Sequence, residues 1–279
     1  MAETPNPPRR PPGDPVFVRR LLSAVILGPV SLGLVALGGH AFAIFIAAFS
    51  AAMAWEWVRM SDKDAPPRAF ATATGTAVGA ALLSAQDAYG WTALWIAAGA
   101  VAVFVDRRPR GRAWESLAGV AYVSASVAVL VGLRDGGEPG GLQAVAFLLA
   151  VVWAADTFAY LAGSWIGGPK LLPAASPNKT WAGLVAGVSF GVFSGLLLAD
   201  WVGVSPLHAL LLAGPTAIAA VLGDLLMSLA KRRFGVKDAG SLIPGHGGVL
   251  DRVDALMLAT LLAGVLSLSP LELWPGGAA

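Results

Sequence analysis

A short stretch near the C-terminal end of the chain gathers most of the residues that could do chemistry. Asp224, Ser228 and Lys231 are spaced four and three residues apart, so they share one face of a helix. Asp251 and Asp254 follow at a spacing of three, where both carboxylates can point the same way at a helix start. Carboxylates without thiolates or clustered imidazoles suit Mg²⁺. The stretch therefore predicts a magnesium site made of Asp224, Asp251 and Asp254.

The segment between these acids, residues 234–248, carries five glycines and a proline and cannot form a regular helix. Backbone N–H groups of such a segment can approach a phosphate. Phosphoryl and nucleotidyl transfer need little beyond alignment, a metal and nearby cations. We expect Lys237 to act in catalysis. The residues expected to bind substrate in and around this segment are Lys231, Arg232, His246, Gly247, Gly248 and Arg252.

A second polar patch precedes the apolar stretch that begins near Thr180. Ser176, Lys179 and Thr180 could hold a phosphate at the positive end of that helix, although Ser or Thr there is also an ordinary N-cap. Asp156 is a further candidate for substrate contact, or it forms a hydrogen bond between helices. The acids at 251 and 254 have an alternative as well, since carboxylates in a first helical turn complement the helix dipole.

Two other acids lie within or at the ends of apolar segments, where a charge is expensive. Glu56 and Asp200 stand beside tryptophans and close to predicted helix ends. We expect both to lie at the membrane interface and to have no catalytic role.

The elements that carry these residues are strongly apolar. Hydrophobic residues make up 56% of the 279-residue chain and charged residues only 13%. No Asp, Glu, Lys or Arg occurs from Leu21 to Trp55, which is long enough for two membrane crossings of ~20 residues each. The sequence predicts an all-α, polytopic integral membrane protein with about nine transmembrane helices, at residues 21–38, 41–59, 69–86, 89–105, 115–133, 141–163, 180–200, 206–230 and 254–271.

The distribution of basic residues predicts the orientation. With a cytoplasmic N-terminus, 18 of the 19 Lys and Arg residues fall on the cytoplasmic side, and Arg134 alone on the other. We expect a multi-pass protein of the cell (inner) membrane whose active site faces the cytoplasm. The predicted parts are a disordered Pro/Arg-rich tail at 1–20, N-terminal transmembrane helices at 21–113, and a C-terminal catalytic region at 114–279 with cytoplasmic loops 164–180 and 231–253.

Small residues predict how one helix packs. Gly183, Gly187, Gly191 and Gly195 recur every four residues and form a groove that lets another backbone approach closely. The absence of cysteine excludes thiolate catalysis and disulfides, and three histidines argue against a His-rich metal site. Basic runs interleaved with aromatics are missing, so nucleic acid is not expected as a partner.

The C-terminal half resembles a known family, the phosphatidate cytidylyltransferases, also called CDP-diacylglycerol synthases. The stretch from Asp156 to Trp181 is similar to that family, although Ala182 stands where Glu or Gln is expected. The family's signature resembles Ser228-x-x-Lys231-Arg232-x4-Lys237-Asp238-x-Gly240-x2-Ile243-Pro244-x-His246-Gly247-Gly248-x2-Asp251-Arg252-x-Asp254.

The resemblance implies transfer of the cytidylyl group of CTP to phosphatidic acid with Mg²⁺, giving CDP-diacylglycerol and pyrophosphate. The three aspartates would hold the metal, and the cations would neutralise the triphosphate or the lipid phosphate. The alternatives are a polytopic lipid transporter or flippase and a CTP-dependent polyprenol kinase. The sequence is compatible with a homodimer and with a second cation beside Mg²⁺, and it leaves acyl-chain preference and the choice of CTP or dCTP open.

Overall fold

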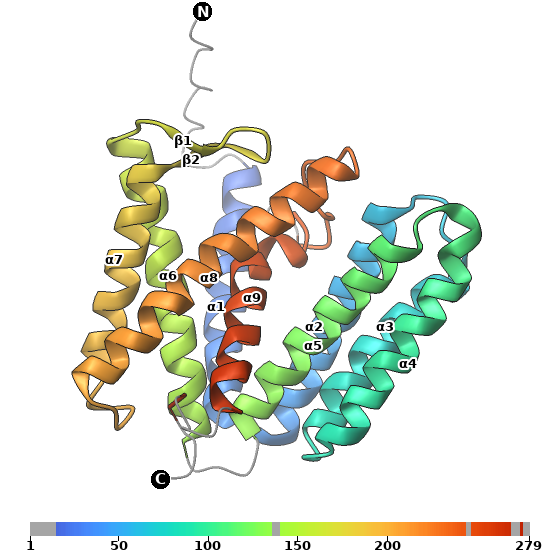
Figure 1. Cartoon of the computed structure of the whole chain (residues 1–279), viewed down its shortest axis with the longest axis horizontal. Helices are drawn as coiled ribbons and strands as arrows, with labels where there is room; N and C mark the ends of the chain where they lie inside the picture. Colours follow the sequence, from blue (N-terminus) through green and yellow to red (C-terminus); the bar gives the residue numbers. More distant parts are fainter. Residues whose placement is uncertain (1–14, 136–139, 244–246, 269–273, 276–279) are drawn as a thin grey trace, which may run out of the picture.

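The computed structural model describes residues 15–135, 140–243, 247–268 and 274–275. Within these ranges the chain forms nine α-helices that run up and down a bundle, with one short two-stranded hairpin and a 3₁₀ turn at Arg108–Arg110 (Figure 1). The helices are α1 (Pro15–Leu37), α2 (Gly39–Ser61), α3 (Pro67–Ser84), α4 (Tyr89–Arg107), α5 (Ala113–Asp135), α6 (Gly141–Trp165), α7 (Trp181–Leu198), α8 (Pro206–Arg233) and α9 (Leu250–Ser267).

Each predicted apolar segment is a helix, and most ends agree within two or three residues. Helix α9 begins at Leu250, four residues before the predicted start, so Asp251 and Asp254 lie in its first turns. Helix α1 begins at Pro15, so residues 15–20 are helical and the predicted tail is too long; residues 1–14 lie outside the described ranges. Among the described helices, six are long and apolar enough to cross a membrane: α2, α4, α5, α6, α7 and α8.

The predicted all-α fold needs one addition, in the loop expected at 164–180. Strand β1 (Lys170–Leu172) pairs antiparallel with β2 (Ser176–Thr180), with Lys170 opposite Thr180. The second strand leads directly into α7, whose N-cap is Thr180: its hydroxyl oxygen accepts the Gly183 N–H at 3.0 Å. The hairpin is therefore tied to the start of α7.

The glycine groove of α7 packs as predicted. A Cβ at Gly183 or Gly187 would lie 2.7 or 2.8 Å from a backbone oxygen of α6. A Cβ at Gly195 would lie 2.6 Å from the Ala213 side chain of α8. Only glycine permits such close approach, so α7 is held against both α6 and α8.

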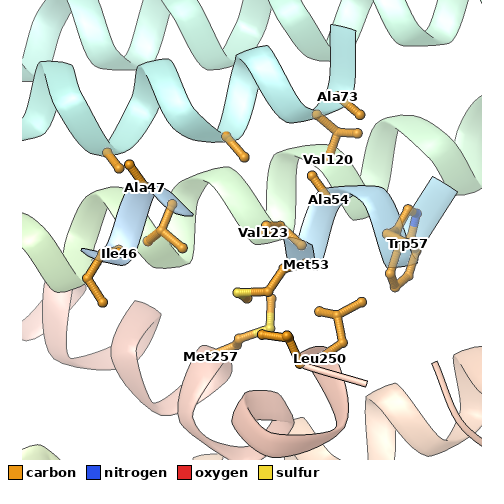
Figure 2. Packing of buried hydrophobic residues seen from close by; sticks show 14 of the residues in the cluster. Ile46, Ala47, Met53, Ala54, Trp57, Ala73, Val120, Val123, Leu250 and Met257 are labelled. Atoms are coloured by element: carbon orange, nitrogen blue, oxygen red, sulfur yellow. The ribbon is translucent and has the colours of Figure 1, made fainter. Parts of the chain in front are cut away.

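Two clusters of buried apolar side chains fill the bundle. In the first, Met53 of α2 and Met257 of α9 point toward each other, and Val123 of α5 belongs to the same cluster (Figure 2). The second joins α6, α8 and α9 around residues such as Leu148 and Ala259. Helix α9 contributes to both clusters, and α5 packs with α2 and α3. The core therefore crosses the boundary predicted at residue 113.

The end of α5 is clamped to the turn between α1 and α2. The Arg134 guanidinium donates to the carbonyl oxygens of Val35 at 2.5 Å and Ala36 at 2.9 Å. Asp135 accepts the Gly39 N–H at 2.8 Å. The one basic residue predicted on the non-cytoplasmic side thus satisfies the carbonyls that end α1.

Candidate active site

The predicted site residues that the structure describes gather at one end of the bundle. At this end α6 and α8 end, α9 begins and α1 starts, and the hairpin lies above α6 and α7 (Figure 1). The opposite end holds the clamp at Arg134. The two polar patches predicted separately from the sequence are therefore neighbours in space.

An ion pair joins the hairpin to α8. The Lys179 ammonium lies 2.5 Å from the Asp224 carboxylate, and both side chains are partly exposed. The Ser228 hydroxyl donates to the other Asp224 oxygen at 3.3 Å, which confirms the predicted one-face arrangement of these two residues. Asp224 is thus presented to the space between hairpin and bundle.

A second lysine contacts the two acids of α9. The Lys231 ammonium lies 2.8 Å from Asp251 Oδ1 and 3.8 Å from Asp254 Oδ2. All three side chains are largely buried, with exposed fractions of 12%, 8% and 15%. An acid at this depth requires a partner, and Lys231 supplies one for both.

Asp251 also organises the glycine-rich segment. Its second oxygen accepts the backbone N–H groups of Ala239 at 2.9 Å and Gly248 at 3.1 Å. Gly247, which directly precedes Gly248, has a φ of +85°, which glycine adopts without strain. Both carboxylate oxygens of Asp251 are therefore engaged in holding the loop and Lys231.

Close packing of α8 on α9 brings Asp224 near Asp254. A Cβ at Gly223 would lie 2.8 Å from the Asp254 carbonyl oxygen, so the two backbones touch at this point. Asp254 lies within electrostatic range of both Asp224 and Asp156. Three acids from three helices thus share one region of negative potential, which Lys179 and Lys231 offset in part.

The predicted magnesium site of Asp224, Asp251 and Asp254 stays a prediction. In the described part of the chain, no three acidic or histidine side chains are placed to share one metal ion. The reason is that Asp251 is committed to loop N–H groups and Lys231. Asp224 and Asp254 keep carboxylate oxygens of the kind that Mg²⁺ prefers, so the donor chemistry fits the ion.

The remaining predicted residues take different places. The Arg232 guanidinium donates to the Ala175 carbonyl at 3.3 Å and so links α8 to the hairpin turn, while Lys237 is exposed in the loop. Ser176 is half-buried in β2. Thr180 is buried and caps α7, which is the ordinary N-cap role that the sequence left open as an alternative. Its contact with substrate stays a prediction. His246 lies outside the described residues.

Glu56 has partners that its sequence neighbours do not reveal. It is fully buried within the bundle, and its expected position at the membrane interface stays a prediction. Its two oxygens accept the backbone N–H groups of Val249 at 3.0 Å and Leu250 at 2.9 Å. A carboxylate within an apolar helix is energetically costly unless it has such partners. The presence of Glu56 in an apolar segment was therefore the sequence signal that could have indicated a buried partner. Asp200, assigned in the same way, is exposed just beyond the end of α7.

An apolar cavity of about 450 Å³ reaches the site from within the bundle. Helices α1, α2, α5, α6 and α9 line it, and Asp156 and Arg252 are among the polar residues of its wall. Its walls are otherwise built from aliphatic and aromatic side chains such as Leu32, Phe49 and Leu256. Hydropathy alone does not reveal such a space, because a cavity wall and a packed core use the same residues.

Comparison with known proteins places the chain among enzymes of one kind. Residues 18–268 match the cytidylyltransferase family. A phosphatidate cytidylyltransferase of Brucella abortus (strain 2308) is 41% identical over 250 residues, which cover 87% of this chain and 90% of the relative. That of Pseudomonas aeruginosa PAO1 is 32% identical over 263 residues, covering 86% and 93%. That of Staphylococcus aureus (strain COL) is 40% identical over 129 residues, covering 45% and 49%.

Proposed function

Because the chain belongs to the cytidylyltransferase family, we propose that the site between the hairpin, α8 and α9 transfers the cytidylyl group of CTP to phosphatidic acid. The products are CDP-diacylglycerol and pyrophosphate. One observation supports this most: a cluster of acids and lysines adjoins an apolar cavity, and Asp156 and Arg252 line the place where they meet. The reaction requires a nucleotide site and a lipid site side by side.

The chemistry asks little of the protein beyond alignment. A phosphate oxygen of phosphatidic acid attacks the α-phosphorus of CTP, and a new P–O bond forms. The bond from that phosphorus to the β-phosphate oxygen breaks, and pyrophosphate leaves with the electron pair. Since a phosphate monoester has a second pKa of about 6, the nucleophile is already ionised and needs no strong base. Rate enhancement then comes from orientation and charge neutralisation.

The basic side chains of the site fall into two groups, one beside the acids and one in the cavity wall. Lys179 and Lys231 lie among the acids, where they neutralise the triphosphate together with Arg232 and Lys237. Arg252 lines the cavity and pairs with the lipid phosphate, while the cavity takes an acyl chain. An apolar pocket of this size lies in the usual range of ~300–1,000 Å³ for small-molecule sites.

Mg²⁺ is the cofactor in this proposal, held by Asp224 and Asp254. Support comes from the donor set, which is carboxylate only, and from the close approach of α8 and α9 at Gly223. When bound, the ion supplies positive charge to the triphosphate and to the departing pyrophosphate. Asp251 holds the loop and is not a ligand here, which departs from the trio that the sequence predicts.

The proposed membrane arrangement has nine spans with a cytoplasmic N-terminus, in the cell inner membrane. The alternating helix directions and the basic residues at the active-site end support it. CTP is a cytosolic nucleotide and the lipid phosphate lies at headgroup level, so the reaction requires a site at that face. The exposed side chains of α4 and α7 face lipid or a second copy of the chain. A homodimer is therefore compatible with the exposed surface of these helices.

Pyrophosphate release by the purified protein in detergent tests the proposal. We expect CTP to be converted to pyrophosphate only when phosphatidic acid is present. A lipid flippase would release none, and a polyprenol kinase would release CDP instead when a polyprenol is supplied to accept the γ-phosphate. Either result under conditions where the protein is folded would overturn the assignment.

A further inference from the structure

We propose that Glu56 is a positioning residue for the active site, through which α2 sets the place of α9 and of the glycine-rich loop. This inference rests on the proposed function, since it concerns the same catalytic end of the bundle. Glu56 belongs to the N-terminal helices, which carry none of the predicted catalytic residues. Its role therefore makes those helices part of the catalytic unit.

Helix α9 lacks a cap of its own. Its N-cap residue is Val249, whose side chain cannot accept a hydrogen bond from the first-turn N–H groups. The Glu56 carboxylate, 193 residues earlier in the chain, accepts instead the N–H of Val249 itself and that of Leu250, the first helical residue. A negative charge at this position also complements the positive end of the helix. The start of α9 is thus held from outside its local sequence.

The loop is shaped around the same carboxylate. A Cβ at Gly240 would overlap Glu56 Oε1, and one at Gly248 would lie 2.7 Å from Oε2. Both glycines leave room for Glu56 by lacking a side chain. The backbone of the loop and the first turn of α9 therefore close around one buried anion.

The contacts continue from Glu56 to the reacting region. It holds Val249 and Leu250, which directly precede Asp251. Asp251 in turn binds the loop N–H groups and Lys231, and Lys231 contacts Asp254. A shift of the first turn of α9 would move both acids relative to Asp224 on α8. Supporting contacts of this kind, when removed, typically reduce activity or metal affinity about 10–100-fold.

The first test compares Glu56→Gln with Ser50→Ala. Glutamine keeps the size but replaces one acceptor oxygen by an amide that faces a backbone N–H. Ser50 is also buried in α2, but its hydroxyl bonds only to Ala47 of its own helix. In Glu56→Gln we expect kcat and the affinity for Mn²⁺, measured by electron paramagnetic resonance titration, each to fall at least about tenfold. We expect the KM for phosphatidic acid to stay within about twofold of the wild-type value, because Glu56 does not line the cavity.

Two results would overturn the proposal in this test. One is wild-type kcat and Mn²⁺ affinity in a folded Glu56→Gln protein. The other is an equal loss in Ser50→Ala, which would indicate general damage to α2. Failure of the proposed function itself looks different, since wild-type protein would then form no CDP-diacylglycerol at all, whereas Mn²⁺ binding still reports on the position of the acids.

The second test remains decisive if Glu56→Gln does not fold. Glu56→Ala removes the Cγ, Cδ and Oε1 atoms that a Cβ at position 240 would meet, and it places no amide against a backbone N–H. We expect Gly240→Ala to lower kcat at least about tenfold in the wild-type background and less than about threefold in the Glu56→Ala background. Equal losses in both backgrounds would show that residue 240 and Glu56 are not coupled, and the proposal would fail.

Discussion

At the scale of single residues, each lysine of the proposed active site is already paired with a carboxylate. A substrate phosphate must compete with that carboxylate for the lysine. Lys179 pairs with Asp224, and Lys231 contacts Asp251 and Asp254. These pairs offset part of the acidic charge before a nucleotide or a metal ion binds. On the proposed function, a triphosphate with its ion gives each lysine a new partner and frees the carboxylates.

The two acids of α9 are expected to differ in what they do. In Asp251→Asn the loop loses a charged acceptor, so turnover should fall and hydrogen exchange at the Ala239 and Gly248 amides should speed up. In Asp254→Asn turnover should fall by a comparable factor, about 10²-fold or more, without that change in exchange. Hydrogen-exchange mass spectrometry and steady-state kinetics on both variants provide the measurement. Unchanged exchange in Asp251→Asn would contradict the role given to its second oxygen.

Residue types were predictable from the sequence, but their partners were not. The i, i+4 relation of Asp224 and Ser228 follows from helix geometry, and the structure confirms it. The commitment of Asp251 to the loop depends on how residues 239 and 248 fold back, which spacing does not encode. Glu56 was missed because its partners lie 193 and 194 residues away.

At the scale of elements, α7 shows how a row of glycines positions a site without touching substrate. Its backbone approaches α6 and α8 closely, and its N-terminus carries the hairpin and Lys179. In a bilayer such close packing substitutes for the hydrophobic effect between helices. Displacement of α7 would carry Lys179 away from Asp224.

Gly187→Ala should therefore destabilise the protein. Its Cβ would lie 2.8 Å from the Ala155 carbonyl oxygen, so the two backbones must separate, at a cost of about 1–3 kcal/mol. The control is Gly75→Ala, a helical glycine whose added Cβ meets nothing within 4 Å. Thermal unfolding in detergent should show a lower midpoint for the first variant only. Equal midpoints for both variants would contradict the packing described for α7.

Helix α1 supplies one wall of the apolar cavity, and a matched pair of glycines tests what the cavity binds. Gly28 lines the cavity and Gly33 does not, and a Cβ at either meets nothing within 4 Å. Gly28→Leu should raise the KM for phosphatidic acid several-fold and leave the KM for CTP unchanged, because the leucine occupies acyl-chain space. Gly33→Leu should change neither constant. If Gly28→Leu binds lipid normally, the cavity does not hold the chain.

Helix positions followed from hydropathy because apolar runs long enough to cross a bilayer have few alternatives to a helix. The hairpin was not predicted, because residues 170–180 contain two prolines and a serine and follow Gly167 and Gly168, a composition that is typical of any loop. The early start of α9 also escaped prediction, because its cap comes from α2 and not from the residues next to it.

At the scale of the whole molecule, polar chemistry and apolar packing are separated along the bundle. The active site occupies one end, the Arg134 clamp the other, and the cavity extends from the first into the core. Helix α9 joins the two hydrophobic clusters and begins at the site. On the proposed function, this arrangement lets a lipid keep its chain among apolar residues while its phosphate contacts the nucleotide.

The absence of cysteine makes the proposed orientation directly testable. Asp238→Cys and Asp200→Cys each place one exposed thiol, at the active-site end and at the opposite end. In intact spheroplasts, a membrane-impermeant maleimide should label Asp200→Cys only. Asp238→Cys should react after the membrane is opened. The reverse labelling pattern would invert the topology.

The central claim is that this acidic and basic cluster joins the α-phosphate of CTP to a lipid phosphate. The most direct measurement incubates purified protein with phosphatidic acid and CTP labelled at either the α- or the γ-phosphate, and follows label into the organic phase. We predict that only the α-label is transferred, and that Asp224→Asn lowers the transfer at least about 10²-fold while Asp200→Asn does not. Transfer of the γ-label, or full activity in Asp224→Asn, would contradict the account.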